Sequence, residues 1–228
     1  MAVIESLRFV AIGLAFLTSA ALARAADEPP LRVLRQLSLM QDRIVAPAAV
    51  PPTHGMRLRL AVIGGSGWRA EEVLDAARRA AEILAQCAIR TASIELDEVE
   101  GPKRYRSLST PVSRELAGRL GLAKPAVFFV ADTLHRPAFD AEAFGRGNTR
   151  ARPEMADTVW IAFGARELPV VIAHELAHVL ADSGEHSGEA DNLMRDETAP
   201  DATHLTPAQC EAIIATGTAN GLLQPLRP

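Results

Sequence analysis

The strongest constraint in the sequence is a pair of histidines four residues apart, His174 and His178, inside a segment with a helical pattern. Residues at positions i and i+4 of a helix lie on the same face, one turn apart, so both imidazoles can bind one metal ion. Glu175 directly follows the first histidine, where a carboxylate can act on a metal-bound water. The segment therefore predicts a metal-binding helix with His174 and His178 as ligands and Glu175 as a general base.

The residues that flank this pair are apolar. Residues 170–173 before it and residues 179–180 after it are valine, isoleucine, alanine and leucine, which indicates a buried helix from about Pro169 to Ser183. Burying histidine and glutamate is costly unless they are paired or bound to a metal ion, so the burial favours a metal site. The alternative is a core helix with two structural histidines and a glutamate in an ion pair.

A catalytic metal site needs a third protein ligand and one open position for water. His186 is the leading candidate, because it follows Gly184, and a glycine there can end the helix and turn the chain back towards the metal. A histidine in an exposed loop is the alternative interpretation. Other side chains that could serve as the third ligand are Asp182, Glu185, Glu189, Asp191 and His204.

These residues and the segment after them resemble the metzincin clan of zinc metallopeptidases. The resemblance is carried by His174-Glu175-x-x-His178, a glycine-centred turn, His186 and Asn192-Leu193-Met194. It implies a zinc ion, Zn2+, bound by three histidines, with Met194 in a tight turn that forms an apolar floor beneath the metal; an ordinary core methionine is the alternative. It also implies an α+β fold with a mixed twisted sheet, a long backing helix, a buried active-site helix and a C-terminal helix.

Two departures from the clan's HExxHxxGxxH pattern stand out. Ala181 takes the glycine position and Gly184 takes the third-histidine position, so the expected turn is displaced by three residues and His186 arrives two positions late. An extra stretch of helix before the turn would accommodate this displacement. The second departure is that no tyrosine follows the methionine, which narrows the subfamily rather than the chemistry, because several families of the clan lack that tyrosine.

The order of the expected elements also resembles such a fold. Hydrophobic patterning predicts strands at residues 57–63, 91–99, 126–131 and 158–163. Periodicity and cap signals predict helices at residues 68–87, 112–120, 169–183 and 206–215. Ser66 is expected to cap the first of these helices, after a tight glycine-rich turn. Residues 103–106 are expected in a solvated basic loop, and residues 141–152 are expected to supply an edge strand.

The first 25 residues are typical of an export signal. Arg8 precedes an apolar run over residues 9–17, and small-x-small sites end at Ala25. The run is short for a bilayer span, so we expect a cleaved signal peptide over residues 1–25 and no stable membrane insertion after cleavage; an uncleaved anchor is the alternative. Residues 26–56 are then a linker, a pro-segment or an edge strand, and residues 57–228 form the catalytic domain.

Cysteine content and charge set further limits. Cys87 and Cys210 favour one disulfide in an exported chain, and two buried free thiols are the alternative. The formal net charge is -4 with both signs interspersed, and aromatic residues make up 4% of the chain, which argues against a nucleic-acid partner.

The sequence therefore predicts a periplasmic or secreted zinc-dependent endopeptidase that acts on a peptide or protein substrate. His174, His178 and His186 would bind the metal, and Glu175 would take a proton from the metal-activated water. The alternative is a non-catalytic exported zinc-binding or interaction protein that keeps the peptidase fold. The sequence contains no pattern that predicts the oligomeric state or the cleavage specificity.

Overall fold

The computed structural model describes residues 28–44, 50–133, 141–144 and 153–227. The segment expected to be a signal peptide, residues 1–25, lies outside the described residues. Most of the expected edge strand after residue 144 also lies outside them. Among the helices that the structure describes, none combines the length and the apolar character needed to cross a lipid bilayer.

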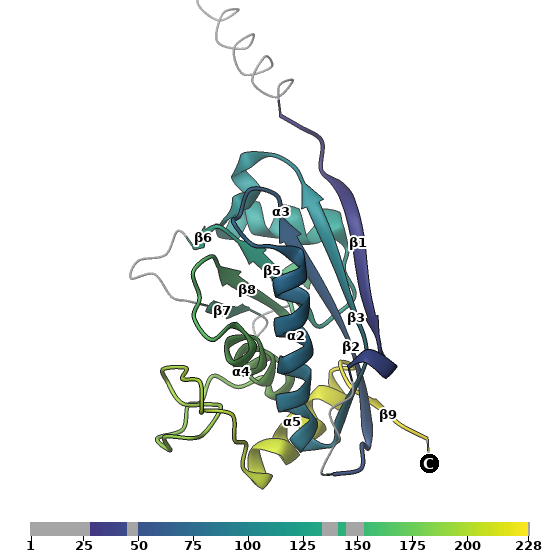
Figure 1. The fold of residues 1–228 in the computed structure, drawn as a ribbon, viewed down its shortest axis with the longest axis vertical. Helices are drawn as coiled ribbons and strands as arrows, with labels where there is room; N and C mark the ends of the chain where they lie inside the picture. Colours follow the sequence, from purple (N-terminus) through teal and green to yellow (C-terminus); the bar gives the residue numbers. More distant parts are fainter. Residues whose placement is uncertain (1–27, 45–49, 134–140, 145–152, 228) are drawn as a thin grey trace, which may run out of the picture.

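Most strands belong to one mixed sheet (Figure 1). In order across the sheet they are β1 (Arg32–Met40), β3 (Ile89–Glu100), β2 (His54–Ile63), β5 (Ala126–Val130), β8 (Thr158–Ala162) and β7 (Ala141–Phe144), and β9 (Gln224–Pro225) pairs with the start of β2. The central strands β3, β2, β5 and β8 run parallel, whereas β1 and β7 run antiparallel at the edges. Two short strands, β4 (Ser107–Leu108) and β6 (Asp132–Thr133), form a separate pair.

Helices cover both faces of this sheet (Figure 1). On one face lie α2 (Ala70–Leu84) and α4 (Leu168–Ala181), with α5 (Pro207–Ala219) beside α4; α3 (Thr110–Leu120) lies on the other face. Successive strand residues point to opposite faces. Leu60 and Phe129 accordingly belong to the core under α2 and α4, and their neighbours Ala61 and Phe128 belong to the core under α3. The fold therefore has three layers and a hydrophobic core on each side of the sheet.

The expected mixed sheet with several helices is confirmed, and the order of these elements along the chain refines the expected α+β class. Helices and strands alternate along the chain, with α2 between β2 and β3 and α3 between β3 and β5, and these connections join parallel strands. A parallel pair needs a crossover that returns the chain to the same end of the sheet, and a helix supplies it. The architecture is therefore mixed α/β. The expected backing helix, buried helix and C-terminal helix correspond to α2, α4 and α5.

The folded unit begins earlier than expected. Residues 32–40, expected in a linker, a pro-segment or an edge strand, form the edge strand β1, and β2 begins at His54. An ion pair between Arg32 and Glu100, with N and O 2.6 Å apart, accompanies the pairing of β1 with β3. Because β1 belongs to the same sheet as the later strands, the unit starts before the boundary expected at residue 57.

Two local expectations are corrected. Ser66 does not cap α2, because the N-cap residue is Arg69 and no side chain caps the helix; Ser66 is instead buried in the preceding turn. The expected basic loop forms a 3-10 turn, η3 (Lys103–Arg106), and its Tyr105 is buried. The hydroxyl of Tyr105 donates to a carboxylate oxygen of Glu115 at 2.6 Å. This segment is therefore attached to α3 by an aromatic ring with a satisfied polar end.

The two cysteines form a disulfide, as expected. Cys87 ends the short 3-10 segment η2 (Ala85–Cys87) after α2, Cys210 lies in α5, and their Cα atoms are 4.9 Å apart. The bridge joins residues separated by 123 positions. Because a long closed loop restricts the unfolded chain strongly, the bridge should contribute substantially to stability.

Replacing both bridging cysteines should destabilise the fold. For the double variant Cys87→Ser, Cys210→Ser we expect the free energy of unfolding to fall by about 3–5 kcal/mol, since the unfolded chain regains the freedom of the opened loop. Urea unfolding followed by circular dichroism measures this difference, and reduced wild type serves as the control. A variant as stable as the oxidised wild type would contradict this role.

Burial of Lys124 should make stability depend on pH. Its ammonium donates to the carbonyl of Glu154 at 3.2 Å, and burial lowers the pKa of Lys124 to about 8, although Asp157 opposes the shift. The unfolded chain, with the ordinary pKa of 10.5, binds more protons between pH 8 and 10.5, so stability should rise with pH through that window. Urea unfolding should show this rise in wild type and in the exposed-site control Lys103→Met, and Lys124→Met should lack it.

Candidate metal centre

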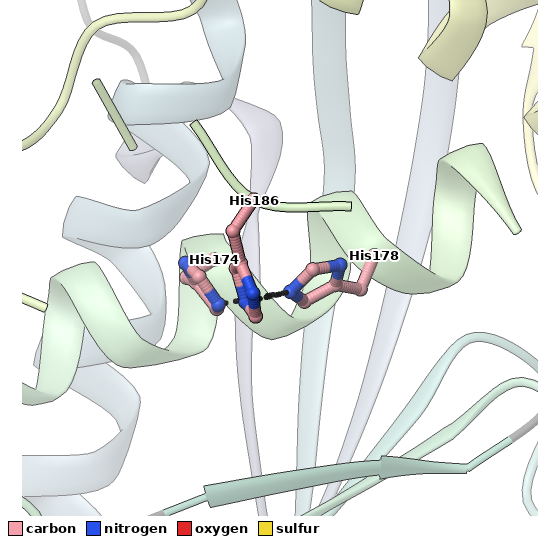
Figure 2. Close-up of side chains that lie close together, drawn as sticks. All are labelled: His174, His178 and His186. Atoms are coloured by element: carbon pink, nitrogen blue, oxygen red, sulfur yellow. Dashed lines mark hydrogen bonds between the residues drawn. The ribbon is translucent and has the colours of Figure 1, made fainter. Parts of the chain in front are cut away.

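The helix that carries the predicted ligands, α4, is almost entirely buried. Pro169 lies in its first turn, where the backbone N–H groups have no partner within the helix, so proline costs no hydrogen bond there. Every residue from 170 to 180 is buried. His174 and His178 lie on one face, as their spacing requires (Figure 2). Glu175, the next residue after the first ligand, is 8% exposed. The helix therefore presents polar groups within an apolar environment.

Backbone carbonyl groups hold both helix histidines. Nδ1 of His174 lies 2.7 Å from the carbonyl oxygen of Leu193, and Nδ1 of His178 lies 2.7 Å from that of Ser183. A carbonyl oxygen can only accept, so this network assigns the hydrogen of each neutral ring to Nδ1 and leaves each Nε2 as a bare acceptor. This is the arrangement in which an imidazole binds a metal ion through Nε2.

His186 joins these two rings in one cluster (Figure 2). Its Nε2 lies 3.1 Å from Nε2 of His178, which in turn lies 2.9 Å from Nε2 of His174. On the far side of the ring, Nδ1 of His186 lies 3.3 Å from Oδ1 of Asp196. The structure therefore places the predicted third ligand beside the other two, with an oxygen behind each ring.

The donor chemistry of this cluster fits a metal ion. Bare imidazole nitrogens that face one another at 2.9 and 3.1 Å repel unless a positive charge lies among them. Two nitrogen ligands of a tetrahedral zinc ion lie about 3.3 Å apart, close to these separations. Of the residues that the structure describes, only these three histidines form such a group. The other third-ligand candidates lie outside it, namely Asp182, Glu185, Glu189, Asp191 and His204.

The chain leaves α4 at Asp182 rather than at Gly184. The helix ends at Ala181, and Asp182 has φ 46° and ψ 42°, a left-handed conformation that aspartate tolerates better than most residues. The N–H of Ser183 then donates to the carbonyl of His178, whose ring donates to the carbonyl of Ser183. The expected extra stretch of helix is therefore absent, and the turn lies one residue, not three, beyond the clan's glycine position.

Met194 lies in a tight turn near the cluster. The N–H of Arg195 donates to the carbonyl of Asn192 across this turn, and Met194 is 6% exposed. With His178 and His186, Met194 lines a cavity of about 270 Å³. The remaining lining residues come mainly from α4 and α5, and these are Ala177, Ala181, Ser183, Glu185, Ala208, Gln209, Ala212 and Ile213. The role of Met194 as a floor beneath a metal stays a prediction.

Sequence reasoning missed the groups behind the three rings. Two of them are the backbone carbonyls of Leu193 and Ser183. Every residue has a backbone carbonyl, so the residue type does not indicate which ones contact a histidine. The third is the carboxylate of Asp196, in an irregular loop. Metal-bound histidines generally donate their second nitrogen to a carbonyl or carboxylate, so an acid near His186 was the one signal in the sequence.

Comparisons with known proteins agree with a metalloproteinase-like fold. No family model matches the chain. The structure of metalloproteinase-II from Bacteroides fragilis superposes with a TM-score of 0.54 at 15% sequence identity, over 75% of this chain and 55% of that one. At this identity the likeness concerns the fold alone. The chain thus spans about half of that structure.

A curated relative has local sequence similarity. The Protease HtpX homolog of Ralstonia pickettii (strain 12J) is 36% identical over 87 residues, which are 37% of this chain and 27% of the relative. The matched region covers about a quarter of that protein. The fold, the three-histidine cluster and the similarity to this distant relative are together consistent with a metallopeptidase. The features specific to metzincins remain predictions from the sequence.

Removing the third histidine should weaken metal binding. We expect wild type to bind one equivalent of zinc, and His186→Ala to bind it at least about 100-fold more weakly, because a ligand is lost from a three-histidine site. Competition with a chromophoric chelator measures the Kd. His204→Ala is the matched control, since this exposed histidine lies outside the cluster. Equal loss in the two variants would contradict the ligand assignment.

Proposed function

We propose that the protein is a zinc-dependent endopeptidase. The observation that carries this proposal is the convergence of the three Nε2 atoms of His174, His178 and His186, with a glutamate directly after the first ligand on a buried helix. Within the described residues no fourth side chain joins the cluster. A site with three protein ligands retains an open position, as catalytic zinc sites require.

The residues of the chain have separate roles in this mechanism. The three histidines would bind the ion, which when bound lowers the pKa of a water molecule and polarises the scissile carbonyl group. Glu175 accepts a proton from the attacking water and donates it to the departing amine. Burial on α4 keeps the carboxylate of Glu175 largely shielded from bulk water, directly after the first ligand.

Two features near the centre would receive an extended peptide. β7 is an edge strand that pairs with β8, and the described residues place no strand on its other side, so a peptide could add there by main-chain hydrogen bonds. The cavity lined by His178, His186 and Met194 is bordered by alanines of α4 and α5 and would take a side chain of the substrate.

We also propose that the protein is exported to the periplasm or secreted. The N-terminal sequence supports this location, and so does the disulfide between Cys87 and Cys210, because disulfides persist mainly in oxidising compartments. Zinc and the peptide substrate are then encountered outside the cytoplasm.

Replacing the general base should abolish cleavage and spare the metal. For Glu175→Gln we expect peptide cleavage to fall by about 100-fold or more, because general-base catalysis is lost, with zinc content unchanged. Cleavage of a quenched fluorescent peptide library and zinc analysis by mass spectrometry measure the two properties. Glu211→Gln, which changes an exposed carboxylate of α5 outside the cavity lining, is the control. Wild type that binds one zinc ion and cleaves nothing would support the non-catalytic alternative.

A further inference from the structure

The loop between α4 and α5 carries two groups on which the metal centre depends. These are the ring of His186 and the carbonyl of Leu193, which accepts from Nδ1 of His174. The loop contains only isolated bridges and turns. Neither a helix nor a strand therefore fixes these groups, and another device has to hold them in place.

A buried amide at the centre of this loop is the candidate device. Asn192 is fully buried, and its Oδ1 accepts from the N–H of Met194 at 2.9 Å. Its side chain also pairs reciprocally with that of Gln209 in α5: Nδ2 of Asn192 donates to Oε1 at 3.0 Å, and Nε2 of Gln209 donates to Oδ1 at 3.1 Å. A satisfied buried amide pair of this kind restricts both side chains to one orientation.

The orientation of Gln209 is set independently of Asn192. Oε1 of Gln209 also accepts from the N–H of Thr206 at 2.8 Å, and the hydroxyl of Thr206 accepts from the N–H of Gln209, which forms a capping box at the start of α5. Each side-chain amide therefore accepts from one backbone N–H, of Met194 for Asn192 and of Thr206 for Gln209. These two donors define which amide atom is oxygen and which is nitrogen. The amide pair thereby connects the loop to the N-terminus of a helix.

Two short paths lead from this pair to the metal ligands. Asn192 is adjacent to Leu193, whose carbonyl holds the ring of His174. The carbonyl of Met194 accepts from the N–H of Ser187 at 2.7 Å, and Ser187 directly follows His186 in the chain. A displacement of residues 192–194 would therefore move both a ligand and the group behind another ligand.

We infer that the Asn192–Gln209 amide pair is a positioning device for the metal centre, which holds His174 and His186 at the separation that the ion requires. The inference rests on the zinc-binding part of the proposed function and is independent of the cleavage reaction. Both residues are positioning residues, because they act through Leu193 and Ser187 and do not bind the metal.

Three variants separate positioning from simple stabilisation. Asn192→Ala removes the pair. Gln209→Glu keeps an oxygen for the N–H of Thr206, since glutamate serves in a capping box, but it loses the donor to Asn192. Thr206→Ala weakens the cap of α5 and leaves both amides in place. Zinc affinity by chelator competition, the visible spectrum of the cobalt(II) form and thermal unfolding without metal are measured for each purified full chain.

We expect Asn192→Ala and Gln209→Glu each to weaken zinc binding about tenfold or more and to shift the cobalt absorption bands, because groups behind metal ligands carry effects of this size. The double variant should be little worse than Asn192→Ala alone, since both changes remove one pair. Thr206→Ala should lower the Tm and keep the wild-type zinc affinity and cobalt spectrum.

Unchanged zinc affinity and cobalt spectrum in Gln209→Glu would overturn the inference, and this variant decides the question if Asn192→Ala does not fold. A loss of affinity in Thr206→Ala equal to that in Gln209→Glu would overturn it as well, because general destabilisation would then suffice. None of these measurements uses peptide cleavage, so an absence of cleavage in wild type would count against the enzyme proposal alone.

Discussion

The metal centre depends on three imidazole rings whose Nε2 atoms converge, and on the groups that lie behind these rings. In this protein two backbone carbonyls fix the hydrogens of His174 and His178 on the nitrogens that face away from the cluster, and the carboxylate of Asp196 lies 3.3 Å behind the ring of His186. A cation bound among the inner nitrogens would offset the repulsion between their lone pairs. Much of the chain after α4 is arranged to supply these groups, since Ser183, Leu193 and Asp196 all lie in the loop before α5.

That loop is supported from several elements in succession. Gln86, in η2 directly after α2, donates to the carbonyl of Thr203 at 2.8 Å and accepts from the N–H of Leu205 at 2.8 Å. The carbonyl of His204 accepts from the N–H of Leu193, so the support reaches the group behind His174. Because α2 is packed on the parallel centre of the sheet, the metal centre derives its position from the large core under α2 and α4.

Regular patterns in the sequence predicted the parts of the site that depend on one element. The four-residue spacing of His174 and His178 and the apolar flanks were sufficient to place a buried helix and two ligands. Proximity in sequence was sufficient to suggest His186, but its position depends on the left-handed Asp182, which carries no such signal. The sheet was largely predictable for the same reason, since buried parallel strands appear as continuous apolar runs.

The features that the sequence did not predict concern contacts between distant segments. β1 is mostly exposed and has weak patterning, so only its pairing with β3 reveals that it belongs to the sheet. Asn192 and Gln209 are polar residues of ordinary loop and helix composition, and their significance arises only when α5 meets the loop. Local patterns report how one element buries its apolar side, and they do not report which buried polar groups will satisfy one another.

The disulfide between Cys87 and Cys210 has a consequence of a topological kind. It closes a covalent ring that contains β3, α3, α4 and all three histidines of the cluster. A single break in the main chain anywhere within that ring yields two segments that are still one molecule under oxidising conditions. For a protein proposed to work among peptidases outside the cytoplasm, and to be one itself, a nicked chain would keep its ligands together and would separate into pieces only after reduction.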